Sequence, residues 1–415
     1  MSTDRHEHEV NRQMAESGDA RKAVYLHVGA PTAGAAFLHR ALWANRRRLA
    51  DAGVGHPVTG PNEHFGAVMD LREMSWGGHR DPAWEGAWDR VAKRAREWDG
   101  PTVVFSHGLL GGATAAQARH AVATLAPADV HVVFATRDLG WQLIYDWQEQ
   151  IRHNHDITFE RFVDDLVEFG IDAPEPFGPM FWGLHDPVRV LKTWESAVPK
   201  ERVHVLTLPA PGSGPDVLWD RFCALTGIDP AGCDVEGLAD DAPLSAVEAE
   251  LLRRLNGRLG TALGGDYERI VRDHLIGSGL AAGTGPADRT PMGLPPRHAD
   301  WAADRTRAIV AALREAGYGV SGDLEELTTS RTPTGGMLPG DVPDELIAAA
   351  SIGVSAHLLE RLNAVHDRIG IAHLHGQLAD VRENLDRLLQ AASAPSPTLQ
   401  RAARRAAGRP TGRRG

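Results

Sequence analysis

The sequence is organised around residues 24–38, which read Val24-Tyr25-Leu26-His27-Val28-Gly29-Ala30-Pro31-Thr32-Ala33-Gly34-Ala35-Ala36-Phe37-Leu38. An apolar run leads into a turn of glycine and proline, and a helical pattern follows the turn. The stretch therefore predicts a first strand that feeds the N-terminus of a helix. Such a junction combines backbone N–H groups that have no helical partner with the positive end of the helix dipole. It is a suitable seat for a phosphate or sulfate group.

Strands and helices alternate through most of the chain. Apolar runs predict strands over residues 102–106, 130–135 and 202–208. Helices are predicted over residues 36–52, 81–98, 114–125, 139–153, 158–169, 189–197, 216–226, 244–259 and 301–316, and a loop over residues 172–179. This rhythm predicts an α/β fold with a central parallel sheet covered by helices. Ligands bind such sheets at the carboxyl ends of the strands, so the segments after Val28, Phe105 and Ala135 are candidate sites.

Composition argues against several classes of protein. The chain has 415 residues, of which 42% are hydrophobic and 24% charged, as is typical of a globular protein. No apolar run approaches the roughly 20 residues of a membrane span. The first 20 residues lack the apolar core of a secretion signal, so we expect a cytoplasmic protein. A net charge of −11 argues against general nucleic-acid binding.

The small number of cysteines also favours a cytoplasmic protein. The chain has two cysteines, Cys223 and Cys233, whereas small secreted disulfide scaffolds use more. Neither cysteine has further ligands at the spacing of a zinc site. We therefore expect neither a disulfide framework nor a bound metal ion.

Five segments are predicted along the chain. They are a flexible leader (1–21), the α/β domain (22–329), a linker rich in Thr, Gly and Pro (330–343), an amphipathic helix or helix pair broken near Gly370 (344–392), and a basic disordered tail (393–415). The amphipathic segment has two interpretations. It either packs on the main domain or associates with a second copy of itself as a coiled coil.

The residues after the first strand resemble a known family, the bacterial sulfotransferases that use 3′-phosphoadenosine 5′-phosphosulfate (PAPS). That family opens with a strand and then Gly-Ala-Pro-Lys-Thr-Gly-Thr-Thr-Phe-Leu, a loop that wraps the 5′-phosphosulfate and binds its oxygens through the lysine and the threonines. The resemblance extends over residues 22–328 and implies a P-loop-type α/β fold. It assigns the cofactor loop to Gly29, Ala30, Pro31, Thr32, Ala33, Gly34, Ala35 and Ala36.

The lining of this loop departs from the family pattern. Thr32 stands at the lysine position, and alanines stand at the positions of the hydroxyl residues. Sulfuryl transfer depends on positioning and on positive charge at the leaving phosphate. Loss of one preorganised donor costs on the order of 10²–10³ in rate in comparable sites. Two interpretations stay open: backbone N–H groups hold an anion weakly, or the loop is only a structural turn.

The third strand end carries the other cofactor residues that the resemblance implies. Arg137-Asp138-Leu139 resembles a family segment whose arginine holds the 3′-phosphate of the nucleotide. The alternative is that Arg137 forms a structural ion pair with Asp138 or another carboxylate. Tyr145, two residues before Trp147-Gln148-Glu149, stands where the family has a serine that binds the same phosphate. Its ring is bulky enough to enter the phosphate site.

The second strand end lacks the catalytic base of the family. Ser106-His107-Gly108 stands where the family has Ser-x-Glu, so glycine replaces the glutamate. His107 is the candidate base, because imidazole titrates near neutral pH, although neighbouring strand residues point to opposite faces. A fourth family site, Asn-x-Ser-Leu, is also changed, to residues 241–244, Asp-Ala-Pro-Leu.

Two functions are compatible with these residues. The first is a sulfotransferase-family protein whose transfer from PAPS is impaired or lost, a pseudoenzyme with a binding role. The second is an active PAPS-dependent sulfotransferase on a hydroxyl acceptor, a small molecule or a carbohydrate. It would use Arg137 for the nucleotide, His107 as base, and Arg152 or backbone amides for the transferred group.

Overall fold

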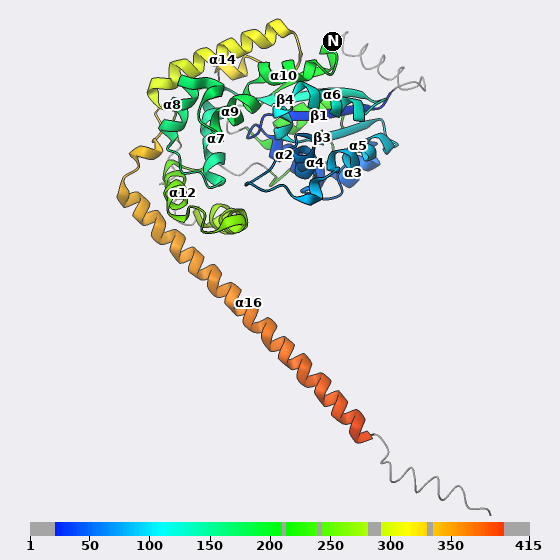
Figure 1. Cartoon of the computed structure of the whole chain (residues 1–415), viewed down its shortest axis with the longest axis vertical. Coiled ribbons are helices and arrows are strands. Elements are labelled where there is room, and N and C mark those ends of the chain that lie inside the picture. The colour runs from blue at the N-terminus through cyan, green and yellow to red at the C-terminus, as the bar shows by residue number, and fades with distance from the viewer. Residues whose placement is uncertain (1–20, 210–212, 239–242, 281–291, 330–334, 394–415) are drawn as a thin grey trace, which may run out of the picture. The chain divides into compact units, whose positions relative to one another are not determined.

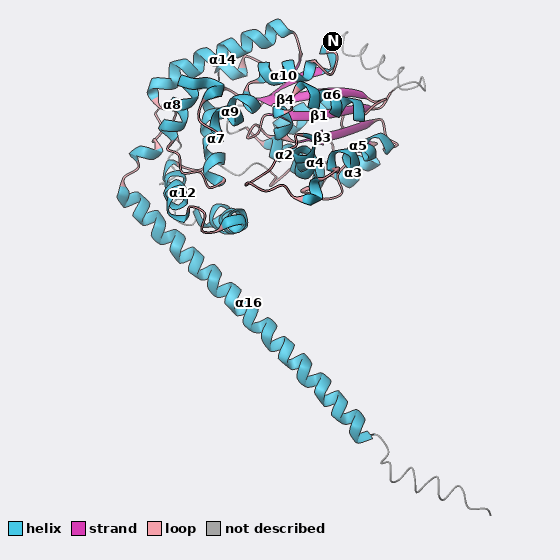
Figure 2. Cartoon of the chain, viewed as in Figure 1, coloured by secondary structure: helices cyan, strands magenta, loops and turns pink. Residues whose placement is uncertain are grey.

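Six parallel strands form the centre of the protein. The computed structural model describes residues 21–209, 213–238, 243–280, 292–329 and 335–393. Its strands are β1 (Ala23–Gly29), β2 (Val54–Gly55), β3 (Thr102–Ser106), β4 (Asp129–Thr136), β5 (Val203–Thr207) and β6 (Gly319–Ser321). They lie side by side in the order β2-β3-β1-β4-β5-β6, and each neighbouring pair is parallel. Figures 1 and 2 show β1 between β3 and β4. The predicted α/β fold with a central parallel sheet is confirmed.

Helices connect and follow the strands along the chain. They are α2 (Ala35–Ala44), α3 (Arg46–Asp51), α4 (Glu63–Leu71), α5 (Ala87–Glu97), α6 (Ala115–Thr124), α7 (Leu139–Arg152), α8 (Phe159–Phe169), α9 (Phe177–His185), α10 (Pro187–Glu195), α11 (Pro215–Thr226), α12 (Ala246–Leu259), α14 (Pro296–Ala316), α15 (Glu326–Thr329) and α16 (Asp344–Ser393), with a π-helix, η6 (Glu268–Gly279). Several begin at side chains that cap the free N–H groups of a first turn. Thr114 and Ser245 form capping boxes, and Asp138, Thr158 and Asp186 also accept from backbone N–H groups.

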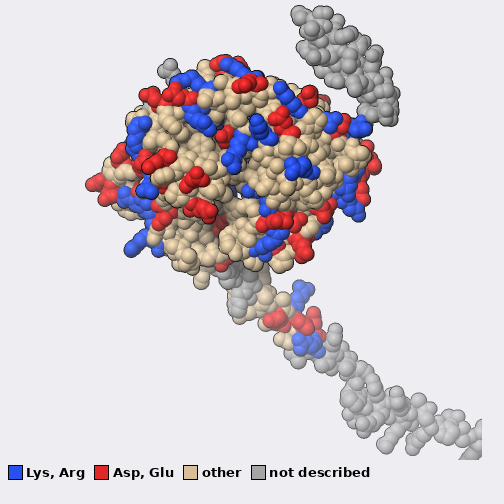
Figure 3. All heavy atoms as spheres, turned by 45° about the horizontal axis from the view of Figure 1, so that its top comes forward, with Lys and Arg blue, Asp and Glu red and all other residues tan. Residues whose placement is uncertain are grey.

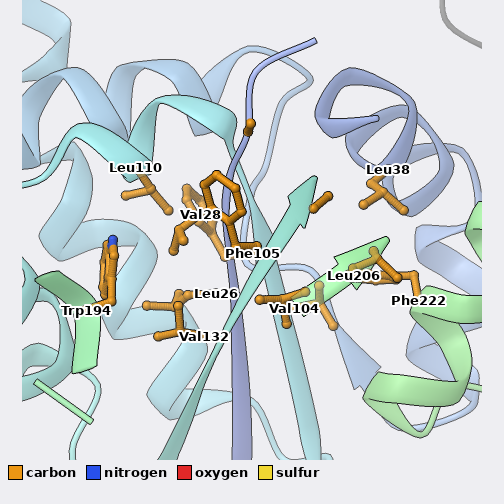
Figure 4. Close-up of a cluster of buried hydrophobic side chains, with 14 of the residues drawn as sticks. Leu26, Val28, Leu38, Val104, Phe105, Leu110, Val132, Trp194, Leu206 and Phe222 are labelled. Carbon is orange, nitrogen blue, oxygen red and sulfur yellow. The ribbon is translucent and has the colours of Figure 1, made fainter. Parts of the chain in front are cut away.

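The core lies on both faces of the sheet. Leu26 and Val132 point to one face, where Trp194 of α10 packs on them; Leu206 points to the other, where Leu38 of α2 and Phe222 of α11 lie (Figure 4). These side chains are fully buried. Burial of a large apolar side chain contributes about 1.5–3 kcal/mol. Burial on both faces explains why the central strands read as continuous apolar runs.

Tertiary contacts changed several element boundaries. The helix predicted over residues 36–52 is divided at Asn45, whose side-chain amide donates to the carbonyl oxygens of Ala41 and of the distant Asp234. The loop predicted over residues 172–179 is wrong from Phe177 onward, where α9 begins. The elements α4, η6 and β6 were not predicted, and β6 is short because it pairs with β5 alone.

The C-terminal segment forms one continuous helix. The helix α16 runs from Asp344 to Ser393, so the predicted break near Gly370 is not present. The chain forms two compact units, residues 1–351 and residues 352–415. Nearly all of the predicted leader and tail, and residues 330–334 of the predicted linker, lie outside the described residues. Among the described helices, none combines the length and apolarity that crossing a membrane requires.

Charged side chains of both signs are mixed on the surface of the first unit. On the face drawn in Figure 3, acidic and basic residues alternate over short distances. Nucleic-acid binding depends on a continuous basic surface. This face therefore does not provide one.

Candidate functional site

The three predicted site segments meet at one edge of the sheet. Strand β1 lies between β3 and β4, so the loops that follow these strands are neighbours. The N–H group of Ala30 donates to the carbonyl oxygen of Ala135 at 2.8 Å, and the N–H group of His107 donates to that of His27 at 3.0 Å. These bonds bring the three strand ends together, as the rule for parallel sheets predicts.

The first loop has the backbone of an anion site. Gly34, with φ of 79°, is the N-cap of α2 and provides no side-chain cap. Because intrahelical bonding begins at Leu38, which donates to the carbonyl oxygen of Gly34, the N–H groups of the preceding turn have no helical partner. Ala36, in that turn, is exposed. The positive end of the helix dipole is therefore accessible here.

The side chains of this loop provide no positive charge. Thr32 stands in the left-handed region with φ of 54°, a costly conformation for a β-branched residue. Its hydroxyl oxygen accepts a 2.6 Å hydrogen bond from the side-chain amide of Gln142 on α7, and the same amide lies 3.4 Å from the carbonyl oxygen of Pro31. The hydroxyl thus stabilises the loop conformation against α7.

Arg137 stacks on an aromatic ring. Its guanidinium carbon lies 4.3 Å from the centre of the Tyr145 ring, a cation–π contact. Among the described residues its buried Nε has no hydrogen-bond partner, and no carboxylate forms an ion pair with it. Asp138 instead caps α7 through the N–H group of Trp141. The alternative of an Arg137–Asp138 ion pair is therefore not observed, and the Tyr145 ring is placed against Arg137.

His107 presents a donor in its neutral form. The N–H group of Leu109 donates to its Nδ1 at 3.1 Å, so the proton of the neutral ring is on Nε2. Burial, and then the positive charges of His39 and Arg72, lower the pKa of His107 to about 3. In this arrangement the ring is uncharged and its N–H donor is at Nε2. A general base needs a free lone pair at that position, so this tautomer does not suit His107 for that role.

Gly108 occupies a position with no room for a side chain. A Cβ atom there would lie 2.9 Å from the backbone nitrogen of Pro31 and 3.0 Å from its Cα. Real Cβ atoms rarely approach backbone that closely. A glutamate at this position would require the first loop to move.

Four histidines from separate segments form a cluster beside this edge, in which His39 is buried and the other three are half-buried. We call His39, His56, His64 and His107 the histidine cluster. The rings of His39 and His64 stack with their centres 3.4 Å apart. The centre of the His56 ring lies 5.5 Å from that of His39, and the centre of the His107 ring lies 4.9 Å from that of His64. Burial lowers the pKa of each ring, and neighbouring histidines lower the pKa further at His39, His64 and His107. Sequence reasoning identified only His107, because no local pattern links the other three.

The nitrogens of this cluster are only partly hydrogen-bonded. His39 donates through Nε2 to Pro61, and His56 through Nδ1 to Val104. Within the described part of the chain, the second nitrogen of each of these two rings has no partner. The described residues also contain no group of three or more side chains arranged to hold a metal ion.

Arg152 lies at the far end of α7. Ten residues separate it from Gln142, which is about 15 Å along a helix axis. Arg152 is therefore distant along α7 from the residue that contacts the first loop, and its contact with the transferred group stays a prediction. Beside it, Glu149 and Glu268 bond to His153 at 3.2 Å and 2.9 Å. Burial alone would lower the pKa of His153, but these carboxylates raise it to about 9.

Gln148 holds the segment before α12. Its side-chain oxygen accepts from the N–H group of Leu244 at 2.9 Å, and its amide donates to the carbonyl oxygen of the same residue at 2.9 Å. Of the changed fourth site, residues 241 and 242 lie outside the described residues. Its last residue is thus fixed to the Trp-Gln-Glu segment of α7.

Comparison with known proteins gives a structural similarity. No family model matches the chain, and no curated protein matches it. Among solved structures, the chain is similar to a sulfotransferase from Alicyclobacillus acidocaldarius. The two are 16% identical, the similarity covers 58% of this chain and 94% of that chain, and the TM-score is 0.35.

Proposed function

We propose that this chain is a sulfotransferase-like protein that binds the phosphate of a nucleotide weakly at residues 29–36 and has impaired or lost sulfuryl transfer from PAPS. The observation that carries the proposal is the contact of Thr32. The residue at the lysine position is neutral, and its hydroxyl is already bonded to Gln142 at 2.6 Å. The loop therefore supplies backbone donors without a cation.

The other two strand ends support the same conclusion. Gly108 has no carboxylate and no room for one beside Pro31. The Tyr145 ring lies against Arg137, the residue that the resemblance assigns to the 3′-phosphate. A phosphate can be held by backbone N–H groups alone. Transfer needs charge stabilisation and proton removal as well, and the described side chains at this edge do not supply that set.

An active transferase is the second candidate, and the position of His107 favours considering it. His107 follows β3 directly and belongs to the same edge as the first loop. Its Nε2–H group could donate to negative charge that develops on a transferred group. This candidate needs a different base, or a His107 ring with the opposite tautomer, and it needs a hydroxyl acceptor.

Binding and transfer are measured separately. Isothermal calorimetry with 3′-phosphoadenosine 5′-phosphate tests binding, and radiolabelled sulfate from PAPS with a panel of phenols, alcohols and sugars tests transfer. We expect weak binding and no labelled product. Tight binding together with a labelled product would refute the loss of activity. No detectable binding at millimolar nucleotide would refute the nucleotide site.

Matched variants locate the binding defect. Thr32→Lys adds a cation to the loop, and we expect it to tighten nucleotide binding about tenfold or more, with Thr32→Gln as the uncharged control. Tyr145→Ser removes the ring beside Arg137, whereas Tyr145→Phe keeps it. Only the serine variant should improve binding of the 3′-phosphorylated nucleotide relative to adenosine 5′-phosphate. Equal effects of serine and phenylalanine would contradict the proposed role of the ring.

A further inference from the structure

The second unit carries a narrow apolar seam along α16. Leu374, Leu378, Val381 and Leu385 are separated by four, three and four residues, and each side chain is more than half exposed. The same spacing continues in the sequence to residue 371, an isoleucine, and to residue 388, a leucine. A repeat of 3.5 residues places all of these positions on one line of a helix.

The period of the seam indicates what covers it. A helix that packs on a globular domain has a broad apolar stripe with a period of 3.6 residues. Between residues 374 and 387 the large apolar residues occupy only the two seam positions of each heptad, whereas Asp380, Glu383, Asp386 and Arg387 lie outside it. An apolar line of two positions in seven is typical of a coiled coil.

We propose that residues 371–392 of α16 pair with the same residues of a second copy of this chain as a parallel, in-register coiled coil. The second copy is the occupant because its helix has the same repeat, the same length and the same exposed leucines. Within the part of this segment whose side chains the structure describes, each helix contributes Leu374, Leu378, Val381 and Leu385. This association is independent of the proposed nucleotide site, because it uses only the second unit.

The flanking residues determine the relative direction of the two helices. With Leu378 and Leu385 at position a, Gln377 is at position g and His375 and Arg382 are at position e. In a parallel pair g faces e, so Gln377 of one copy faces Arg382 of the other and no like charges meet. In an antiparallel pair e faces e, so Arg382 would meet a basic residue. The polar flanks therefore favour the parallel arrangement.

Sedimentation equilibrium of the full chain between 1 and 100 μM tests the association. This concentration range detects a dimer whose dissociation constant is about micromolar. We expect a dimer for the native chain and at least a tenfold weaker dimer for Leu378→Asp. The control Ala379→Asp places the same charge one residue away, outside the seam, and should leave the dimer intact. A monomeric native chain, or a dimer that tolerates Leu378→Asp, would overturn the proposal.

Oxidative cross-linking tests the direction and the register. In a Cys233→Ser background, Val381→Cys should form a disulfide-linked dimer, because this seam position faces itself in a parallel in-register pair. Glu383→Cys, on the outer side of the helix, should not. Cross-linking of Val381→Cys only when it is mixed with Leu378→Cys would indicate an antiparallel pair and contradict the proposal. Unchanged thermal unfolding of the first unit would show that each variant folds.

Discussion

Replacement of His27 should change how stability depends on pH. His27 lies on β1, its side chain is fully buried, and its Nδ1 is 2.8 Å from the hydroxyl oxygen of Ser106. Burial lowers its pKa from the ordinary 6.5 to about 4. Between these values the unfolded chain binds a proton that the folded chain does not. The stability contributed by the neutral ring is therefore present above pH 6.5 and is lost as the pH falls toward 4.

The size of this effect follows from the two pKa values. Between pH 7.5 and pH 5.0, one group with these values lowers the free energy of unfolding by about 2 kcal/mol. His27→Gln removes the titrating ring and keeps a hydrogen-bonding group for Ser106. The variant should be less stable than the native chain at pH 7.5, and the difference between the two should shrink by about 2 kcal/mol at pH 5.0.

Urea unfolding at the two pH values measures this difference. The comparison isolates His27, because all other titrating groups are present in both chains. His120→Gln, at an exposed position of α6, is the matched control for the same substitution away from the core. If His27→Gln and the native chain lose the same free energy between pH 7.5 and 5.0, the reasoning from burial is refuted.

Three further predictions concern the same unit. Gly34→Ala should lower the free energy of unfolding in urea by about 1–3 kcal/mol, because φ is 79° and the new Cβ would lie 2.4 Å from Leu218. Glu326→Gln should cost about 1–3 kcal/mol in the same assay, because the carboxylate accepts two hydrogen bonds from Arg221 at 2.6 and 2.8 Å. The raised pKa of His153 contributes stability that is full below pH 6.5 and lost as the pH rises through about 9. The stability difference from His153→Gln should therefore shrink in alkaline urea titrations, and a constant difference would contradict the assignment.

Local patterns predicted the framework of the fold correctly. The first strand, the turn at Gly29 and Gly34 and the helix after it follow from an apolar run, two flexible residues and a helical pattern. The predicted helix over residues 139–153 matches α7, because Asp138 caps it and the apolar spacing continues to Ile151. These signals act over a few residues, so they survive without knowledge of the rest of the chain.

Local sequence patterns did not predict how contacts with distant segments change the bounds of these elements. Asn45 divides a continuous helical pattern because its amide reaches a carbonyl group 189 residues away. Phe177 begins α9 in a segment rich in proline and glycine, because tertiary burial outweighs the local preference. The sequence also predicted a break near Gly370, but α16 continues through this residue.

The sequence by itself determined the α/β class, the meeting of three strand ends at one edge, and the residue types there, which include no lysine in the first loop and a glycine at position 108. These features depend on residue type and on order along the chain. Only the tertiary structure decided that Gln142 donates to the Thr32 hydroxyl oxygen, that Pro31 closes the space at Gly108, and that histidines from four segments share one cluster. The physical reason is that these contacts join side chains far apart in the chain, and packing alone sets their distances.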